Sequence, residues 1–378
     1  MTTNLRHAAG ELLVAGLAGT ELTGLERAWL RLVRPGGVIL FKRNITDAAQ
    51  THALLVEATG FCAPHAVRCV DVEGGTVNRL RDALAPLPSA QAVGAAMRRL
   101  RKPAPAHQFG ELIARAVKAF GFNTTLAPVV DLALPEAAEV LGSRPPGSRA
   151  EEVIEFARAF LAGLTAQGIA GCGKHFPGLG GAASDTHFVT PEIDRTWQQI
   201  WNEDLAPYRE LHAAMPMIMM NHAAYPATPG KNRPASASDF WITNVLRRRI
   251  GYRGIILSDD LEMGGILKFM PVEEAAVAAV RAGSDLIEIC HSAELILRSY
   301  EALIVEAERS AAFRKLLLER ARTAARKRAK LYAKPALRAL TNKQFETLRA
   351  RILKFRDFIA ASEADAIAPR AAAPAEIS

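Results

Sequence analysis

The chain has 378 residues, of which 49% are hydrophobic and 23% charged, and its formal net charge is +8. This composition predicts a water-soluble globular protein, in one large domain or two, with enough apolar residues for a sizeable core. No apolar run reaches the roughly 18 residues that a membrane-spanning helix needs, so no membrane partner is expected.

The first apolar stretch, residues 12–17, is short and has Glu11 at its edge. We interpret it as a strand and not as the core of a signal peptide, which predicts a cytoplasmic protein. The cysteines show no C-x-x-C spacing, so buried free thiols are favoured over a disulfide framework or a zinc site. They are Cys62, Cys69, Cys172 and Cys290.

The positive charge is concentrated near the C-terminus. Residues 309–356 carry sixteen Lys and Arg against two acidic residues, Glu319 and Glu346, so the rest of the chain is net acidic. We interpret this basic segment as a solvated helical face; the alternative is a weak attraction to nucleic acid or to anionic surfaces. No aromatic interleaving or nucleic-acid motif accompanies the charge, so no nucleic-acid partner is expected.

Eight short apolar segments recur along the chain, with helical stretches between them. Several are near-continuous apolar runs without alternation, which is typical of parallel strands buried on both faces. The repeated strand–helix pattern predicts an α/β fold, a single (β/α)₈ TIM-type barrel; a doubly wound open sheet is the alternative that the pattern leaves open. The segments are residues 11–18, 38–41, 66–72, 124–132, 169–175, 215–222, 254–259 and 285–290.

Several of the intervening helices have recognisable ends. Ser148 and Glu151 are spaced as a capping box for a helix that Gly168 ends. Pro271 is placed to open another helix at its first turn, and Gly283 is placed to close it.

The C-terminal part is predicted to be helical from residue 291 to about residue 334, where Pro335 interrupts the helix. Another helix is predicted over roughly residues 342–361, and the last stretch, rich in Ala and Pro, is predicted to be disordered. The expected organisation is therefore a barrel domain over residues 1–334 and a basic, helical and partly disordered extension over residues 335–378.

Polar residues cluster where six of the predicted strands end. Because the chemistry of such barrels collects at the C-terminal ends of the strands, these residues predict a site for a small polar molecule. Their mixture of donors and acceptors suits sugar hydroxyls, and the Lys and Arg residues are also compatible with a phosphorylated substrate. The clusters are Lys42-Arg43-Asn44, Asp71 with Glu73 and Arg79, Asp131 with Arg144, Lys174-His175, Asn221-His222 and Ser258-Asp259-Asp260.

A glycine-rich segment, residues 178–183, is loosely similar to a dinucleotide-binding turn. Such a turn must open a helix directly after a strand, but Phe176-Pro177 intervenes and no helical pattern follows. We interpret the segment as a long loop that closes over a ligand. The loop carries Asp185 and His187, and a carboxylate that orients an imidazole makes a suitable general acid/base.

Asp259 follows an apolar strand, where a carboxylate serves as a nucleophile, a metal ligand or a helix cap, and Asp260 comes next. At this point the chain resembles glycoside hydrolase family 3, and more narrowly its bacterial β-N-acetylglucosaminidase branch. The resemblance extends in order over roughly residues 10–300. It rests on residues 174–180 (KHFPGLG), 185–187 (DTH), 36–44, 70–79 and 258–263.

The resemblance implies a role for each matched residue. Asp259 corresponds to the nucleophile, His187 to the acid/base and Asp185 to its partner, and no metal or cofactor is implied. The loop departs from the family pattern at Leu179 and Gly181. The residues implied to hold the sugar are Asp71, Arg79, Arg144, Lys174 and His175.

The implied activity is that of a retaining, exo-acting β-N-acetylhexosaminidase that works through a covalent glycosyl-enzyme. Its expected partner is a small carbohydrate or a muropeptide carrying a terminal β-linked N-acetylglucosamine, in cytoplasmic peptidoglycan recycling, and a monomer is expected. Two alternatives of other classes remain: a metal-dependent barrel hydrolase using His175, His187 and Asp259 with a carboxylate such as Asp71, and a sugar-binding protein without activity. Phosphorolysis by the same residues is a further alternative.

Overall fold

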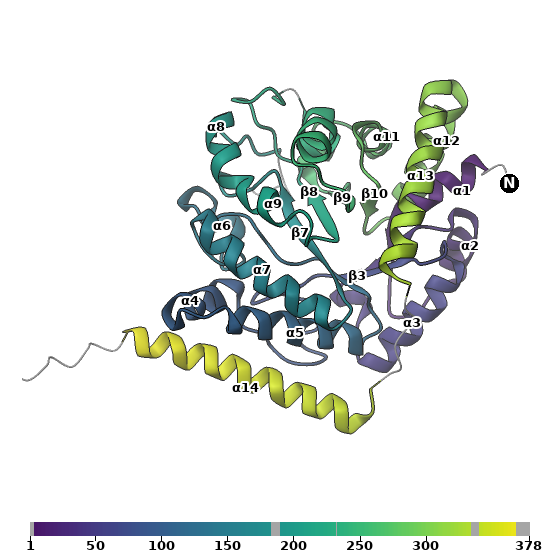
Figure 1. Ribbon diagram of the computed structural model, residues 1–378. Coiled ribbons are helices and arrows are strands. Elements are labelled where there is room, and N and C mark those ends of the chain that lie inside the picture. Colours follow the sequence, from purple (N-terminus) through teal and green to yellow (C-terminus); the bar gives the residue numbers. More distant parts are fainter. Residues whose placement is uncertain (1–3, 183–189, 232, 334–339, 368–378) are drawn as a thin grey trace, which may run out of the picture.

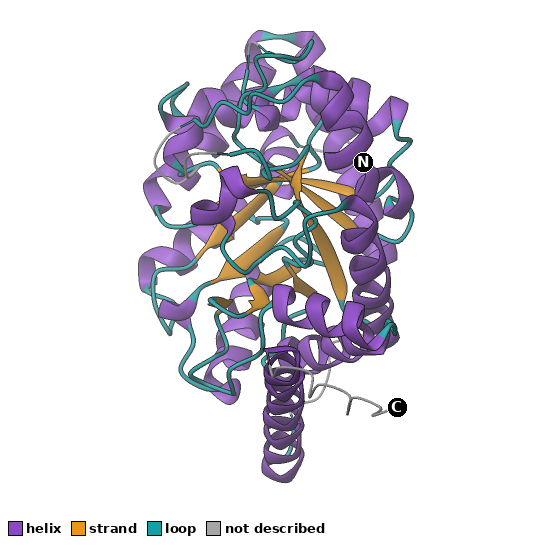
Figure 2. Ribbon diagram, turned by 90° about the vertical axis from the view of Figure 1, so that its left-hand side faces the viewer, coloured by secondary structure: helices purple, strands orange, loops and turns teal. Residues whose placement is uncertain are grey.

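The computed structural model describes residues 4–182, 190–231, 233–333 and 340–367, with side chains up to residue 362. Within this part, eight parallel strands form a closed barrel in the order β1-β10-β9-β8-β7-β6-β3-β2. The barrel confirms the predicted TIM-type fold and excludes the open sheet; helices surround it (Figure 2). The strands are β1 (Leu13–Gly16), β2 (Gly37–Leu40), β3 (Val67–Val70), β6 (Thr124–Thr125), β7 (Ala170–Phe176), β8 (Met217–Met220), β9 (Ile255–Asp260) and β10 (Leu286–Ile289).

The remaining elements cover the barrel or connect its strands (Figure 1). The helices are α1 (Leu5–Glu11), α2 (Gly24–Val33), α3 (Ala48–Phe61), α4 (Ala90–Leu100), α5 (Ala104–Ala119), α6 (Ala138–Leu141), α7 (Ala150–Ala166), α8 (Trp197–Gln199), α9 (Ala206–Leu211), α10 (Gly264–Leu267), α11 (Val272–Ala282), α12 (Ala293–Arg309), α13 (Ala311–Leu331) and α14 (Asn342–Ile367). The 3₁₀ helices are η1 (Lys42–Asn44), η2 (Pro135–Ala137) and η4 (Ala235–Ala237), and the π-helices are η3 (Ile200–Asp204) and η5 (Phe240–Arg249). A hairpin of β4 (Val72–Gly74) and β5 (Val77–Asn78) follows β3.

One predicted strand is much shorter than expected. The segment predicted as residues 124–132 pairs regularly only over β6, and beyond it a single bridge joins Val129 to Lys174. Pro128 interrupts the ladder because proline has no backbone N–H to donate. The apolar run therefore marks a buried segment correctly but overstates its regular pairing.

The capping box predicted for α7 is wrong. The helix is capped by Arg149, without a side-chain hydrogen bond. Because the helix begins later than predicted, the backbone N–H of Ser148 donates to Glu152 Oε2 at 3.2 Å and no reciprocal pair forms. The predicted end is confirmed, since Gly168 follows the last turn with a φ of +74° that favours glycine.

The later helix predictions are confirmed with one change. Pro271 caps α11 and Gly283 ends it with a φ of +121°. The continuous helix predicted after residue 290 is divided into α12 and α13, because Ser310 is extended and its Oγ accepts from the N–H of Phe313 at 3.2 Å. The helix α14 begins at Asn342 as predicted. The helix continues to Ile367, beyond the predicted end near residue 361. The predicted break at Pro335 and the chain after residue 367, which belongs to the stretch predicted to be disordered, lie outside the described residues.

The helix α14 packs along α4 and α5 on the outside of the barrel (Figure 1). Its buried side chains recur at helical spacing, and Phe355 stacks on Phe109 of α5 with ring centroids 6.0 Å apart. The domain division at residue 334 stays a prediction. The buried apolar positions of α14 are Leu348, Ile352, Phe355 and Ile359.

The helix α13 closes the end of the barrel where the strands begin. Arg328 is 0% exposed and donates from Nη1 to the backbone oxygen of Glu11 at 2.8 Å, next to β1. Tyr332 shares a hydrogen bond of 2.6 Å with Thr124, the first residue of β6. Side chains of α13 and the residue that follows it therefore close this end of the barrel.

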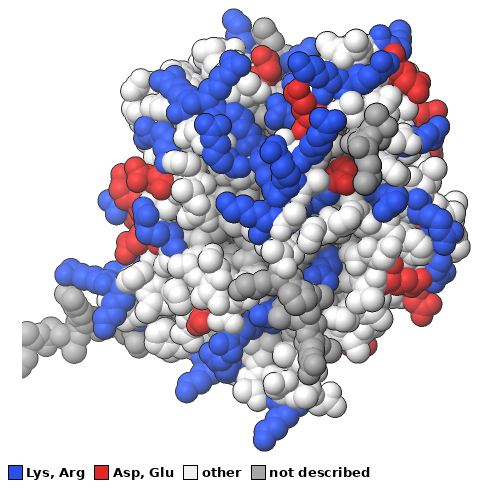
Figure 3. Space-filling model, turned by 45° about the vertical axis from the view of Figure 1, so that its right-hand side comes forward, with Lys and Arg blue, Asp and Glu red and all other residues white. Residues whose placement is uncertain are grey.

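The basic segment is in part a solvated face, as predicted. Lys and Arg gather on the side of the molecule that α12 and α13 form (Figure 3). Arg328 contradicts the interpretation, because its guanidinium is buried in an ion pair with Glu11. The exposed basic residues of α13 are Arg314, Lys315, Arg322, Arg326 and Lys330.

Two further expectations concern the whole described chain. All four cysteines are free and buried, as predicted. Among the helices that the structure describes, none has both the length and the apolar character needed to cross a membrane.

Replacing Asp285 with Ala is expected to lower the free energy of unfolding by about 3–5 kcal/mol. Asp285 is fully buried before β10, pairs with Arg247, and accepts from Lys327 Nζ and the backbone N–H of Ile256 at 2.8 Å each. Its loss leaves two cations without their counter-charge. Urea unfolding of both proteins measures the difference.

The matched control for that measurement is Asp357→Ala. Asp357 pairs with Arg356 at 2.6 Å on the exposed surface of α14, and exposed pairs contribute less than about 1 kcal/mol. Equal destabilisation by the two substitutions would contradict the role assigned to Asp285.

Candidate active site

A cavity of about 400 Å³ opens where the barrel strands end, on the opposite side from α13. Of the residues to which the family resemblance gives a role, four line it: Asp71, Arg79, Lys174 and Asp259. A larger groove of about 1260 Å³ lies on the outside of the barrel between α5, α7 and α9, and no strand contributes to it. Because only the smaller cavity contains the carboxylates of the strand ends, it is the candidate active site.

Asp259 is held rigidly at the end of β9. The three residues Ile255–Leu257 that precede it are buried in the barrel, and Ser258 Oγ accepts from the N–H of Glu288 on β10 at 3.0 Å. Asp259 itself is half-buried and lines the cavity. The strand therefore presents one carboxylate to a ligand in a fixed position.

The surroundings of Asp259 keep its carboxyl ionised. Burial alone would raise the pKa of Asp259, but the electrostatic effect of His175, His222 and Lys174 outweighs burial. The pKa of Asp259 is therefore below its ordinary value. A carboxylate that is ionised at neutral pH is the form that a nucleophile requires.

Asp260 has a different role from Asp259. Its Oδ1 accepts from the backbone N–H groups of Glu262 at 3.1 Å and Cys290 at 3.2 Å, so it fixes the ends of β9 and β10. Burial, with the nearby charges of Glu262 and Asp259, raises the pKa of Asp260 to about 7.

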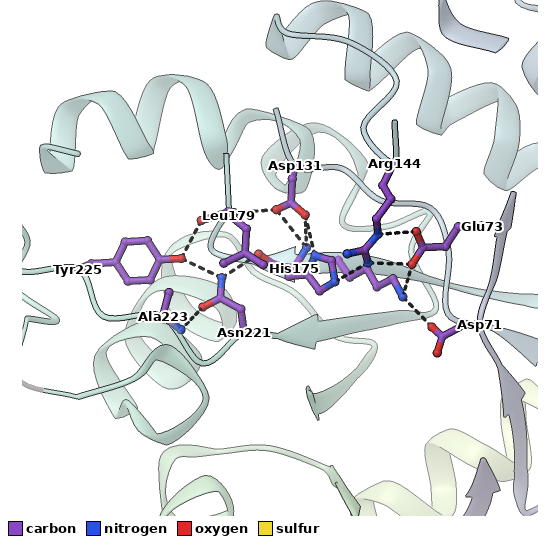
Figure 4. A network of polar contacts seen from close by, with 11 residues as sticks. Asp71, Glu73, Asp131, Arg144, His175, Leu179, Asn221, Ala223 and Tyr225 are labelled. Atoms are coloured by element: carbon purple, nitrogen blue, oxygen red, sulfur yellow. Dashed lines mark hydrogen bonds and ion pairs between the residues drawn. The ribbon is translucent and has the colours of Figure 1, made fainter. Parts of the chain in front are cut away.

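Lys174 is the centre of a buried ion-pair network, whose acidic members Asp71 and Glu73 are labelled in Figure 4. It is 3% exposed, and its Nζ lies 2.8 Å from Asp71 Oδ1 and 2.6 Å from Glu73 Oε1. Arg144 binds Glu73 in a bidentate pair, with N–O distances of 2.8 and 2.9 Å. Burial would raise the pKa of Glu73, but Arg144 and Lys174 hold it below its ordinary range. The network keeps the Lys174 ammonium at the cavity wall.

His175 is oriented by groups on two sides. Its Nδ1 lies 2.6 Å from Asp131 Oδ2, and its Nε2 lies 3.1 Å from Arg144 Nη2. Because a guanidinium only donates, this contact favours the tautomer in which Nδ1 carries the proton and donates to Asp131. Neither His175 nor Arg144 lines the cavity. Arg144 contacts Glu73, a partner of Lys174, and His175 contacts Arg144.

The start of the loop after β7 is anchored to the same network (Figure 4). The backbone N–H of Leu179 donates to Asp131 Oδ1 at 2.8 Å, and the Tyr225 hydroxyl donates to the carbonyl oxygen of Gly178 at 2.7 Å. Asn221 in turn donates to Tyr225 at 2.8 Å. Since Leu179 contributes its backbone to this anchor, the departure from the family pattern at this position leaves it intact.

Comparison with known proteins identifies the family. Residues 5–316 match the glycosyl hydrolase family 3 N terminal domain. The chain belongs to glycosyl hydrolase family 3. A β-hexosaminidase of Idiomarina loihiensis is 36% identical over 279 residues, which are 74% of this chain and 83% of that protein. A β-hexosaminidase of Chromobacterium violaceum is 38% identical over 285 residues, 75% of this chain and 79% of that protein.

Solved structures of family 3 proteins share the architecture. A β-N-acetylglucosaminidase of the family from Paenibacillus sp. superimposes with a TM-score of 0.83 and 29% identity over 94% of this chain and 69% of that one. Native NagZ from Neisseria gonorrhoeae gives 0.75 and 28% over 91% of this chain and 97% of that one. The resemblance inferred from the sequence motifs is thus confirmed, and the chain is a glycoside hydrolase.

The cavity of this family 3 chain has a cationic rim. Arg43 lines the mouth, donates to the carbonyl oxygen of Leu17 at 3.0 Å, and lies 3.0 Å from His291 Nδ1. Its guanidinium lies over the ring of Phe41 at 4.8 Å, and Phe41 in turn lies 5.2 Å from the His291 ring. Arg79 lies 3.9 Å from Asp71 at the same rim. Positive charge therefore surrounds the cavity mouth.

The predicted acid/base pair, Asp185 and His187, lies outside the described residues, so its position stays a prediction. The same holds for the alternative metal site, which needs His187. In the part of the chain that the structure does describe, no group of three or more His, Cys, Asp or Glu is arranged to hold a metal ion.

Sequence reasoning placed Glu73 and Asp131 in the strand-end clusters without assigning their partners, and it missed His291 and Glu288. Glu73 and Asp131 stand beside predicted strand ends, but only the folded chain shows that they hold Arg144 and His175. His291 directly follows the last predicted strand, and this position alone could have placed it at the site. Glu288 interrupts the apolar strand β10. An ionisable residue inside such a run indicates a functional position, but the segment was interpreted only as a strand.

Proposed function

We propose that this glycoside hydrolase is a retaining, exo-acting β-N-acetylhexosaminidase that removes terminal β-linked N-acetylglucosamine through a covalent glycosyl-enzyme. The proposal is supported by Asp259, an ionised carboxylate fixed at a strand end inside the cavity. The similarity to proteins named β-hexosaminidase and β-N-acetylglucosaminidase supports the choice of sugar.

In the proposed mechanism, Asp259 attacks the anomeric carbon while the bond to the leaving oxygen breaks. His187 gives its proton to that oxygen, and Asp185 stabilises the imidazolium form. In the second step His187 takes a proton from water, which attacks the anomeric carbon and releases Asp259. Two displacements at one carbon retain the β configuration.

The proposed sugar contacts divide into direct and indirect ones. Asp71, Arg79 and Lys174 line the cavity and are proposed to bind sugar hydroxyls. Arg144 and His175 were predicted to hold the sugar; we propose that they act by positioning Lys174 and its partners.

The proposed natural substrate is a 1,6-anhydro-muropeptide from peptidoglycan recycling, in the cytoplasm, acted on by a monomer. The cationic rim of Arg43 and Arg79 supports an acidic aglycone. Incubation with this substrate should release N-acetylglucosamine at the same rate in the presence and absence of phosphate. Release that depends on phosphate would point to phosphorolysis, and no release would refute the assigned substrate.

The decisive assay compares turnover of a β-N-acetylglucosaminide and the matching β-glucoside. The N-acetylglucosaminide is expected to be the better substrate, and proton NMR of the first product should show the β anomer. Initial release of the α anomer would refute the retaining mechanism. Binding of the sugar without turnover would favour the sugar-binding alternative, and loss of turnover on chelation would favour the metal-dependent one.

His187→Ala is expected to reduce turnover most for substrates with poor leaving groups, because these need protonation at the departing oxygen. The measurement is kcat for a series of aryl β-N-acetylglucosaminides of rising phenol pKa. The variant should show a much steeper dependence on leaving-group pKa than the wild type. An equal loss across the series would contradict the acid role of His187.

A further inference from the structure

Glu288 is fixed in the middle of β10, directly beside the nucleophile strand. It is opposite Val14 of β1 on one side and Asp260 of β9 on the other. Its backbone N–H donates to Ser258 Oγ at 3.0 Å, and its carbonyl oxygen accepts from Leu261 at 2.9 Å. The backbone of Glu288 is therefore held in place on both sides, and the residue lines the cavity.

The carboxyl of Glu288 has little compensation from the protein. It is 2% exposed, and its one hydrogen bond within the described chain comes from Cys69 Sγ at the long distance of 3.7 Å. The nearby lining residues Ile39, Leu126 and Met219 are apolar. A buried polar group without good partners costs stability, so its presence at a ligand cavity calls for a partner on the ligand.

The surroundings of Glu288 favour the neutral carboxylic acid form of its side chain. Burial raises its pKa well above the ordinary value, the charges of Asp71, Asp259 and Asp260 raise it further, and only Lys174 opposes them. The other titratable groups that face it are thiols whose pKa is raised by burial, so they add no charge; they are Cys69, Cys172 and Cys290. In this form Glu288 carries an O–H that can donate.

We propose that Glu288 is a specificity-determining residue that donates a hydrogen bond from its carboxyl O–H to an oxygen of the sugar held in the cavity. The proposal rests on the proposed function, because it takes a β-N-acetylglucosaminide as the ligand. Glu288 differs in role from Asp259: it forms no covalent bond to the sugar and selects the substrate through one hydrogen bond.

The test compares Glu288→Leu and Glu288→Gln with the wild type. Kinetics are measured on p-nitrophenyl β-N-acetylglucosaminide and the corresponding β-glucoside, and the melting temperature is measured for each protein. Glu288→Leu is expected to lower kcat/KM at least about tenfold, the size of one lost buried hydrogen bond. Its melting temperature should stay equal or rise, because an apolar side chain removes a poorly compensated acid. Glu288→Gln should keep kcat/KM within about threefold, since its amide donates without charge.

Comparing the two substrates shows which oxygen of the sugar accepts the hydrogen bond from Glu288. A loss confined to the N-acetylglucosaminide places it on the acetamido group, and an equal loss on both substrates places it on a shared hydroxyl. Cys69→Ala is the matched control: it removes the one hydrogen-bond partner that the carboxyl has among the described residues and should leave kcat/KM unchanged, since Cys69 does not line the cavity.

Three outcomes would overturn the proposal. Wild-type kcat/KM in Glu288→Leu shows that no contact exists. A fall in melting temperature and activity in both variants shows a structural role only, as does the same loss in Cys69→Ala. A wild-type chain that neither hydrolyses nor binds N-acetylglucosamine overturns the proposed function itself, which calorimetry with the free sugar detects separately.

Discussion

Asp259→Ala is expected to lower kcat for a β-N-acetylglucosaminide on the order of 10³- to 10⁵-fold, the range typical for loss of a catalytic nucleophile. The reason is geometric and electrostatic. Asp259 lines the cavity at the end of a buried strand, and its pKa is held below the ordinary value, against the effect of burial, by His175, His222 and Lys174. Stopped assays with purified protein measure the loss.

Azide rescue makes this test specific for a nucleophile. In Asp259→Ala, azide can enter the vacated space and attack the anomeric carbon of an aryl glycoside with a good leaving group, giving an α-glycosyl azide. The wild type should give no such product. A variant with near wild-type turnover, or one whose rescued product is β-configured, would contradict the assignment of Asp259.

The adjacent carboxyl provides the comparison. Asp260→Asn keeps an oxygen that can accept from the N–H groups of Glu262 and Cys290, which are the contacts that Asp260 makes. It is expected to lose far less activity than Asp259→Ala. Equal losses in the two variants would mean that the damage comes from the end of β9 and not from a missing nucleophile.

The barrel could be predicted from the sequence because its strands are buried on both faces. Several strands are therefore almost continuous apolar runs, which local composition reveals without knowledge of distant contacts. The prediction fails where regular strand pairing stops although the apolar segment continues. This happens around Pro128, which has no backbone N–H to donate to the neighbouring strand. It also fails at the start of α7, where the cap falls on Arg149.

The candidate site could be predicted only in part, because its ion pairs join residues that are far apart in the sequence. Asp71, Lys174 and Asp259 stand at strand ends, and the barrel brings such ends together. Glu73 and Arg144 are far apart in sequence, and their bidentate pairing exists only in the fold. Arg328 shows the same limit, since a buried guanidinium inside a basic run is indistinguishable by composition from its solvated neighbours.

Lys174→Met is expected to lower the free energy of unfolding by about 3–5 kcal/mol and kcat/KM by about tenfold to a hundredfold. Lys174 is the shared counter-charge of Asp71 and Glu73, at 2.8 and 2.6 Å. Glu73 keeps its bidentate pair with Arg144 in the variant, but the one ion pair that Asp71 keeps among the described residues is with Arg79, at 3.9 Å. Asp71 is therefore left poorly compensated at the cavity wall.

The pH dependence of this destabilisation follows from the sign of the Glu73 shift. Its pKa is lowered in the folded chain, because Arg144 and Lys174 outweigh burial, so its pairing stabilises the fold above the unfolded-state pKa. That contribution is lost as pH falls and the carboxyls take up protons. The stability difference between wild type and Lys174→Met should therefore shrink from neutral to acid pH; a difference that grows in acid would contradict the ion-pair explanation.

A double-mutant cycle separates the ion pair from the loss of packing around Lys174. Asp71→Asn removes the charge that the Lys174→Met variant leaves uncompensated, so the double variant should recover part of the stability lost in the single one. The expected coupling is about 1–3 kcal/mol, as for residues in direct contact. Activity should not recover in parallel, because both side chains line the cavity and the sugar would lose two partners at once. Stability that returns without activity is the result that distinguishes a binding residue from a structural one.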